Sequence, residues 1–341
     1  MSVTQLRWGI LGTGNIARQF AAGVRTARRS VITAVGSRTL DAANQFAQAN
    51  TIPAAVGSYL ELIDREDVDA IYLSLPNSMH HEWTIAALRA GKHVLCEKPL
   101  AVNHAQSEEM FDEAQRAGRV LMEAFMYRSH PLTLAVMDAI RGGAIGQVKL
   151  IRASFCYRTT RISNNIRFSR ELAGGALMDV GCYCINFCRM VAGAEPAKIS
   201  AAAQLLPSGV DEATSALLEF PNGIQATFNC GMSVQADNTT SVCGTEGYIE
   251  IPVPWKPPVR NAAWILGRSI PPLQELGGKP APASQPRETR TVNADAELYA
   301  MEADDFAETV LDGKPVRVSR EDTLGNMKVL DKIRRQIGLQ F

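Results

Sequence analysis

The sequence predicts an α/β protein with two domains: a doubly wound parallel sheet, followed by an α+β domain with a large, mostly antiparallel sheet. Three observations support this prediction. The chain has 341 residues, more than a single hydrophobic core usually organises. Apolar runs alternate with helical patterns over the first 125 residues, as βαβ units require. Beyond that point a period-two pattern appears instead. We therefore expect domains over residues 1–125 and 126–341.

The first domain is expected to alternate strands and helices throughout. Short apolar or β-branched runs predict strands over residues 6–11, 30–35, 69–75, 92–97 and 119–124. Helical spacing predicts helices over residues 15–25, 40–49, 78–91 and 103–118. Ser58 and Glu61 form a capping box that opens one more helix. Strands in such an alternation pair in parallel and are covered on both faces.

The second domain is expected to be built on antiparallel strands. Alternate residues from Ile224 to Val234 are apolar, which is typical of a half-buried antiparallel strand. The Pro- and Gly-rich residues 266–287 predict a surface loop. Further strand patterns cover residues 148–158 and 241–251, and helical patterns cover residues 130–143, 297–311 and 320–337.

The charge balance argues against several partners. Lys plus Arg and Asp plus Glu both number 35, so neither nucleic acid nor an anionic membrane surface is an expected partner. No apolar run approaches the roughly 20 residues that span a bilayer. The N-terminus lacks a basic segment followed by an apolar one, so we expect no secretory signal and a cytoplasmic location.

The cysteines and histidines do not predict a metal site. None of the seven cysteines forms a C-x-x-C pair, and on a helix Cys182 and Cys184 would point in nearly opposite directions. We therefore expect buried free thiols. His80 and His81 are adjacent, but no cluster of other ligand-type residues accompanies them.

A glycine-rich loop links the first strand to the first helix. Gly12-x-Gly14-x-x-Ala17 follows the strand directly, and Asn15 and Ile16 open the helix. In this context the first glycine permits a tight turn and the second lets the backbone approach a pyrophosphate, while the alanine allows close packing. The helix N-terminus then presents free amides to the phosphates. The loop predicts a dinucleotide-binding Rossmann domain.

Ser37 and Arg38 follow the second strand, where an NAD-binding domain carries an acidic residue for the ribose hydroxyl. An arginine at this place can bind a 2′-phosphate through paired hydrogen bonds. We therefore predict NADP as the cofactor. The alternative is that Arg38 is a solvated surface charge.

Two segments lie where parallel strands end. Ligands of such sheets bind beyond the carboxyl ends of the strands. Glu97-Lys98-Pro99 occupies one such end, and proline restricts the backbone of the lysine that precedes it. Residues 74–81 occupy another. The cofactor-binding residues expected here are Leu75, Asn77, His80, Glu97 and Lys98.

These motifs together resemble the Gfo/Idh/MocA oxidoreductases. The resemblance rests on GTGNIA (12–17), AGKHVLCEKPL (90–100) and GGALMDVGCYCIN (174–186), and it covers nearly the whole chain. Residues 210–223, 241–251 and 333–341 are most similar to the branch of dimeric dihydrodiol and NADP-dependent D-xylose dehydrogenases. Membership implies a Rossmann domain, a second domain whose open sheet face forms a homo-oligomer, and Lys98 as a catalytic residue. Tyr183 stands where many members have histidine, which makes inositol dehydrogenation less favoured.

Chemistry gives these residues roles. Oxidation of an alcohol needs a base while the nicotinamide takes the hydride. We assign Tyr183 as the acid/base and Lys98 as the cation that lowers its pKa. Asp179, one helical turn before Tyr183, would bind substrate or Lys98. Other expected substrate-binding residues are Arg128, Phe155, Arg167 and Trp255, with His130 as a further candidate.

The sequence therefore predicts an NADP-dependent oxidoreductase acting on a sugar, with oxidation at C1 of an aldose such as D-xylose or D-glucose favoured. Three enzymatic alternatives use the same residues: a trans-dihydrodiol dehydrogenase, a ketosugar reductase, and an aldose oxidoreductase that keeps NADP bound. A non-catalytic NADP-binding sensor is an alternative of another class.

Overall fold

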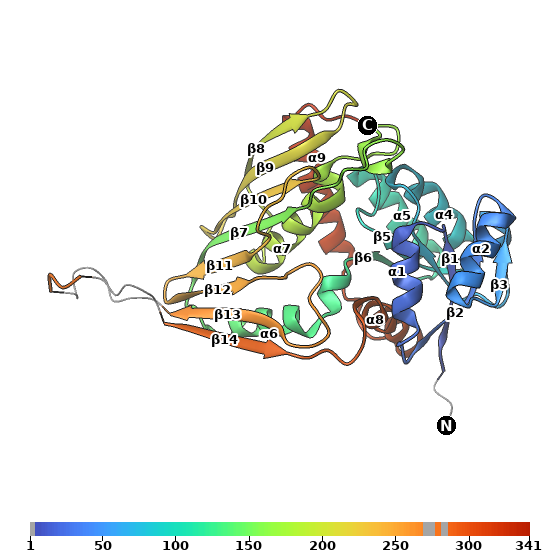
Figure 1. Ribbon diagram of the computed structural model, residues 1–341, viewed down its shortest axis with the longest axis horizontal. Coiled ribbons are helices and arrows are strands. Elements are labelled where there is room, and N and C mark those ends of the chain that lie inside the picture. The colour runs from blue at the N-terminus through green and yellow to red at the C-terminus, as the bar shows by residue number, and fades with distance from the viewer. Residues whose placement is uncertain (1–3, 269–276, 281–285) are drawn as a thin grey trace.

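The computed structural model describes residues 4–268, 277–280 and 286–341. It has two sheets that lie side by side, one in each half of the chain (Figure 1). The predicted fold class is confirmed: a parallel sheet is followed by a larger, mostly antiparallel one. No helix within these residues is long and apolar enough to cross a bilayer.

The first sheet has six parallel strands in the order β3-β2-β1-β4-β5-β6. Its strands are β1 (Leu6–Leu11), β2 (Ser30–Gly36), β3 (Ala54–Val56), β4 (Ala70–Leu73), β5 (His93–Glu97) and β6 (Leu121–Ala124). Its helices are α1 (Asn15–Val24), α2 (Leu40–Asn50), α3 (Tyr59–Ile63), α4 (His80–Arg89) and α5 (His104–Ala117). The strand order reverses between β1 and β4, which is where an open parallel sheet forms its ligand crevice.

The second sheet has eight strands in the order β14-β13-β12-β11-β7-β10-β9-β8. They are β7 (Val148–Cys156), β8 (Lys198–Leu205), β9 (Asp211–Glu219), β10 (Gln225–Gly231), β11 (Thr240–Gly244), β12 (Gly247–Ile251), β13 (Ala262–Arg268) and β14 (Arg287–Val292). The alternating segment forms β10, which pairs antiparallel with β9 as expected but parallel with β7. Ala226, Phe228 and Cys230 of this strand are buried, and Gln225, Thr227 and Asn229 are exposed.

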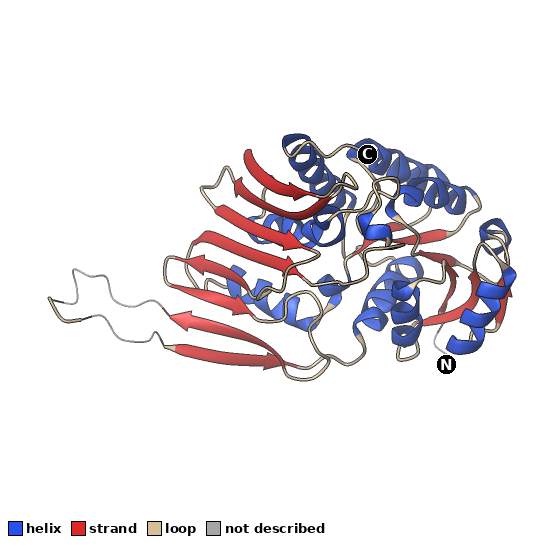
Figure 2. Cartoon of the chain, turned by 45° about the horizontal axis from the view of Figure 1, so that its top comes forward, coloured by secondary structure: helices blue, strands red, loops and turns tan. Residues whose placement is uncertain are grey.

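Helices cover one face of the second sheet. α6 (Pro131–Arg141), α7 (Cys182–Ala192) and α9 (Arg320–Gln336) pack on the strands, and within the described chain no helix lies on the opposite face (Figures 1 and 2). A π-helical turn, Leu177–Gly181, leads into α7. The sheet therefore has one buried and one open face.

The helix α8 (Leu298–Asp312) returns to the first sheet. The Phe306 ring lies 5.2 Å from the ring of Trp8 on β1, and the Asp304 carboxylate accepts from the backbone amides of Arg28 and Arg29. Late residues of the chain thus complete the core of the N-terminal half.

The predicted loop over residues 266–287 is only partly correct. Residues 266–268 belong to β13 and Arg287 belongs to β14, because these two strands pair along their length. Much of the remaining prediction, residues 269–276 and 281–285, lies outside the described residues.

Candidate active site

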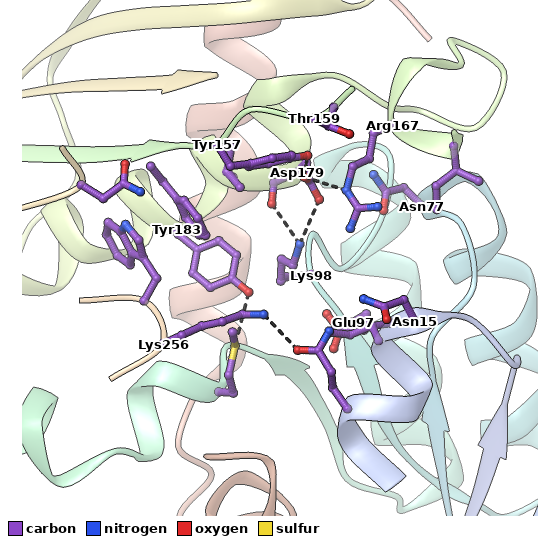
Figure 3. A pocket seen from close by; sticks show the side chains of 18 of the residues that line it. Asn15, Asn77, Glu97, Lys98, Tyr157, Thr159, Arg167, Asp179, Tyr183 and Lys256 are labelled. Atoms are coloured by element: carbon purple, nitrogen blue, oxygen red, sulfur yellow. Dashed lines mark hydrogen bonds and ion pairs between the residues drawn. The ribbon is translucent and has the colours of Figure 1, made fainter. Parts of the chain in front are cut away.

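A cavity of about 800 Å³ lies between the two halves of the molecule (Figure 3). The N-terminal half contributes the start of α1 and the carboxyl ends of β4 and β5. The second half contributes β7, the turn before α7 and the segment between β12 and β13. Among the predicted site residues, this cavity is lined by Asn15, Ile16, Leu75, Asn77, Glu97, Lys98, Phe155, Arg167, Asp179, Tyr183 and Trp255.

Asp179 is the centre of a polar network in this cavity. Lys98 Nζ donates to the Asp179 backbone oxygen at 2.9 Å and lies 3.5 Å from Oδ1. Oδ2 accepts from the Tyr157 hydroxyl at 2.6 Å and from Arg167 Nε at 2.8 Å. The carboxylate thus fixes one cation from each half of the molecule (Figure 3).

The network keeps its members charged. Burial favours a neutral Asp179, but Lys98, Arg167 and the Tyr157 hydroxyl outweigh it, so the pKa of Asp179 is lowered. Burial likewise favours neutral Lys98, but Asp179 outweighs it and raises the pKa of the lysine. The pair is therefore ionic at neutral pH.

Tyr183 lines the same cavity with its hydroxyl group protonated. Its side chain is buried, and the hydroxyl donates to Met126 Sδ at 3.3 Å. Burial, and then the Glu97 carboxylate, raise the pKa of Tyr183 well above 10. The predicted lowering of this pKa by Lys98 is therefore wrong. Lys98 Nζ lies 5.2 Å from the centre of the Tyr183 ring, so the ammonium faces the ring rather than the hydroxyl.

Two aromatic side chains form an apolar wall. The rings of Phe155 and Trp255 stack with their centres 5.5 Å apart and their planes at 9°. Trp255 Nε1 donates to the Ser154 backbone oxygen at 2.7 Å, which fixes the indole. An aromatic face beside polar groups is suited to the apolar face of a sugar ring or to an aromatic diol.

The glycine loop has the geometry that a pyrophosphate needs. Gly12 has φ +110°, a conformation that favours glycine. Gly14 caps α1 without a side-chain hydrogen bond, and a Cβ added there would meet nothing within 4 Å. Gly14 therefore leaves room for a ligand to approach the backbone at the start of α1. A glycine loop of this geometry, followed directly by a helix N-terminus, fits the pyrophosphate of a dinucleotide.

Ser37 and Arg38 follow β2, beside the glycine loop but outside the cavity. Ser37 is buried with its hydroxyl 3.3 Å from that of Thr13, and Arg38 is exposed. Glu97 is buried at the inner end of the cavity, where Tyr72 donates to it and burial raises its pKa. Asn77 Nδ2 donates to the Ala173 backbone oxygen at 2.8 Å.

His80 does not line the cavity, contrary to the sequence-based expectation. It is fully buried, with Nε2 2.9 Å from the Leu75 oxygen and Nδ1 3.0 Å from the Pro99 oxygen. Burial lowers its pKa. The imidazole thus connects the segments that follow β4 and β5.

Arg128 and His130 are also outside the cavity. Arg128 Nη1 donates to Asp322 Oδ2 at 2.6 Å and to Asn186 Oδ1 at 3.0 Å, so the guanidinium joins α7 to α9. His130 caps α6, where Nδ1 accepts from the Leu132 amide at 3.0 Å. Their expected contacts with substrate hydroxyls are wrong, because both side chains bind protein groups instead.

Sequence reasoning missed several residues of the cavity, notably Gln19, Tyr157 and Lys256. Tyr157 directly follows β7 and lies two residues beyond Phe155, and this period-two spacing could have identified it. Lys256 stands before Pro257 as Lys98 stands before Pro99, but Lys279 and Lys314 also precede prolines, so this dipeptide does not single it out.

Comparisons with known proteins match both halves of the chain to one family. Residues 6–125 match the oxidoreductase family with an NAD-binding Rossmann fold, and residues 133–250 match the GFO/IDH/MocA C-terminal domain. The chain is 38% identical to trans-1,2-dihydrobenzene-1,2-diol dehydrogenase of Bos taurus over 256 residues, which are 74% of this chain and 76% of the relative.

Two solved structures share nearly the whole fold. KijD10, a 3-ketoreductase from Actinomadura kijaniata in complex with NADP and TDP-benzene, matches with a TM-score of 0.87 and 29% identity over 98% of each chain. An aldose-aldose oxidoreductase from Caulobacter crescentus, complexed with glycerol, matches with a TM-score of 0.84 and 28% identity over 97% of each chain.

The fold, the glycine loop and the relatives together define an oxidoreductase that binds a nicotinamide dinucleotide and acts on CH–OH groups. The chain belongs to the Gfo/Idh/MocA family, which confirms the resemblance found in the sequence.

Proposed function

We propose that the protein transfers a hydride between C4 of NADP and a sugar, with C1 of an aldose such as D-xylose or D-glucose as the favoured position. The main observation that supports this proposal is the ionic Lys98–Asp179 pair, which lies beside Tyr183 at the carboxyl edge of the parallel sheet. Phe155 and Trp255 support a sugar by offering an aromatic wall opposite these polar groups.

Each residue has one task in the proposed reaction. When bound, the nicotinamide exchanges the hydride. Lys98 holds the reacting oxygen by hydrogen bonding, and Asp179 fixes the direction of its ammonium. In reduction the Tyr183 phenol donates its proton to the reacting oxygen. In oxidation the same group must first lose its proton before it accepts that of the substrate hydroxyl, a step that its raised pKa opposes. Glu97, the residue before Lys98, favours the ammonium form of the lysine electrostatically.

Reduction of a ketosugar is a second candidate. The raised pKa of Tyr183 supports it, because a protonated phenol is ready to donate. The likeness to a 3-ketoreductase points the same way. The dihydrodiol relative supports a third substrate class, trans-diols.

We propose NADP rather than NAD because Arg38 is exposed at the end of β2, without an ion pair among the described residues. A 2′-phosphate would supply its partner. KijD10 binding NADP is consistent with this choice.

The test follows absorbance as NADP+ is reduced in the presence of aldoses, inositols, sugar phosphates and trans-diols, and follows NADPH oxidation with ketosugars. Tyr183→Phe is measured beside the parent protein. We expect turnover with an aldose that falls about 10²–10⁴-fold in the variant. Equal turnover in both proteins would exclude Tyr183, and tight NADPH binding without any turnover would favour a sensor.

We further propose that residues 1–125 bind the cofactor, that residues 126–341 bind the substrate, and that two copies associate through the open face of the second sheet. Leu150 is exposed there, in register with Gln225 of the neighbouring strand. Sedimentation of the parent protein and of Leu150→Lys tests this, since a charge on that face should reduce association.

A further inference from the structure

We propose that Lys256 binds the pyrophosphate of the cofactor, so that the second domain contributes a cation to the dinucleotide site. Its ammonium reaches from the segment between β12 and β13 to α1 of the first domain, where Nζ lies 3.0 Å from Gln19 Oε1. The inference rests on the dinucleotide-binding role of the first domain and is independent of the identity of the sugar.

The backbone around Lys256 is held rigidly. Trp255 is buried, donates to the Ser154 oxygen and stacks on Phe155, so the residue before Lys256 is anchored. Pro257 follows and restricts the lysine backbone to extended conformations. A side chain on such a segment loses little additional freedom when its ammonium binds a ligand.

The position of Lys256 favours the pyrophosphate over the 2′-phosphate of the cofactor. Gln19, its partner, lies one helical turn after Asn15 and lines the same cavity. The pyrophosphate of a Rossmann domain lies at the N-terminus of this helix. The 2′-phosphate end, at Ser37 and Arg38, is outside the cavity that Lys256 lines.

Within the described residues, the charge of Lys256 is balanced only in part, by the Glu97 and Asp179 carboxylates acting without direct contact. Among the described residues it makes no ion pair, and the amide of Gln19 is neutral. Although the residue is exposed as a whole, desolvation of the ammonium and then Lys98 lower its pKa. An anion at this place would balance the cation, and in Figure 3 Lys256 points into the cavity from the wall opposite Asn15.

Direct binding tests the proposal without any need for turnover. NADPH and NADH are titrated separately against the whole protein by fluorescence, without substrate and at two salt concentrations. The variants are Lys256→Met, which keeps the length of the stem, and Lys256→Gln, which keeps a polar end. Lys328→Met removes an exposed lysine of α9 outside the cavity and serves as the matched control.

We expect both Lys256 variants to bind NADPH and NADH about tenfold more weakly, by the same factor for each, with a smaller loss at high salt. Lys328→Met should bind like the parent. Affinities within about twofold of the parent, or a loss for NADPH alone, would overturn the proposal. Because no substrate is present, this result is separate from the sugar assay.

Discussion

The two lysines of the cavity differ in how the protein treats their charge. Lys98 and Lys256 each precede a proline and reach the cavity from opposite halves of the molecule. Lys98 is paired with Asp179 and has a raised pKa. Lys256 donates to the Gln19 side-chain amide, its one hydrogen-bond partner among the described residues, and has a lowered pKa. This difference matches the two roles that we propose, a catalytic cation for Lys98 and an anion-binding group for Lys256.

The largest expected effect tests the paired lysine. Lys98→Met removes the cation that we propose for the reacting oxygen, while Arg167 and Tyr157 still hold Asp179. We expect kcat to fall about 10³-fold. Steady-state kinetics at saturating cofactor measure it, with Lys328→Met as the control. If cofactor affinity falls but kcat is retained, Lys98 binds the cofactor as we propose for Lys256, and its catalytic role is wrong.

Asp179→Asn removes the ion pair of Lys98, so that Lys98, like Lys256, has a neutral amide in place of a carboxylate partner. Burial then lowers the pKa of Lys98, because the largest opposing charge has been removed. Since the ammonium form holds the substrate oxygen, activity should be lost at a lower pH on the alkaline side than in the parent. We expect kcat/KM to fall about a hundredfold near neutrality. A profile from pH 7 to 11 measures both, and an unchanged alkaline limb would contradict this role.

Arg38→Ala tests the third cation, which lies outside the cavity. We expect the efficiency with NADP to fall about tenfold and that with NAD to change little, because only NADP carries a 2′-phosphate. The ratio of kcat/KM for the two cofactors is the measurement. If it equals that of the parent, Arg38 is a solvated surface charge.

Glu123, a buried carboxyl group with no ion pair among the described residues, can be compared with Asp179 for its effect on the stability of the protein. Glu123 accepts from the Leu100 amide at 2.9 Å, and burial raises its pKa to about 7, whereas the paired Asp179 has a lowered pKa. The folded state therefore holds this proton more tightly than the unfolded state. The stability that this adds is present at low pH and is lost as pH rises towards 7, by on the order of 3 kcal/mol.

Glu123→Gln keeps an oxygen acceptor for the Leu100 amide and removes the titration. We expect the urea midpoint of the variant to change less between pH 5 and pH 8 than that of the parent. Parallel pH dependence in both proteins would mean that Glu123 does not titrate in this range.

Much of the first domain could be predicted because its signals are local. Gly12 and Gly14 adjoin a strand and a helix, and Lys98 is placed by the end of β5. The second sheet is harder to read. β14, Arg287–Val292, is almost entirely exposed, so it has no buried face to create a period, and β3 has only three residues. The parallel pairing of β10 with β7 joins segments whose register depends on tertiary packing.

The errors at the site have the same origin. Arg128 is a plausible ligand for a hydroxyl until Asp322, 194 residues further along the chain, is found to occupy its guanidinium. His80 lies at the correct end of the sheet, but backbone oxygens on both sides of it keep its ring away from the cavity. The direction of the Tyr183 pKa depended on burial, which the local sequence does not reveal. Local patterns thus identified the place of the site but not the partners of each side chain.

Transfer of deuterium tests the central claim most directly. The protein is incubated with NADP+ and an aldose deuterated at C1, and the reduced cofactor is analysed by mass spectrometry. The proposed reaction predicts one deuterium at C4 of the nicotinamide with the parent protein, and its loss with Lys98→Met and Tyr183→Phe. Reduced cofactor that carries no deuterium would contradict hydride transfer from C1. If the two variants label the cofactor as fully as the parent protein does, the roles assigned to Lys98 and Tyr183 are wrong.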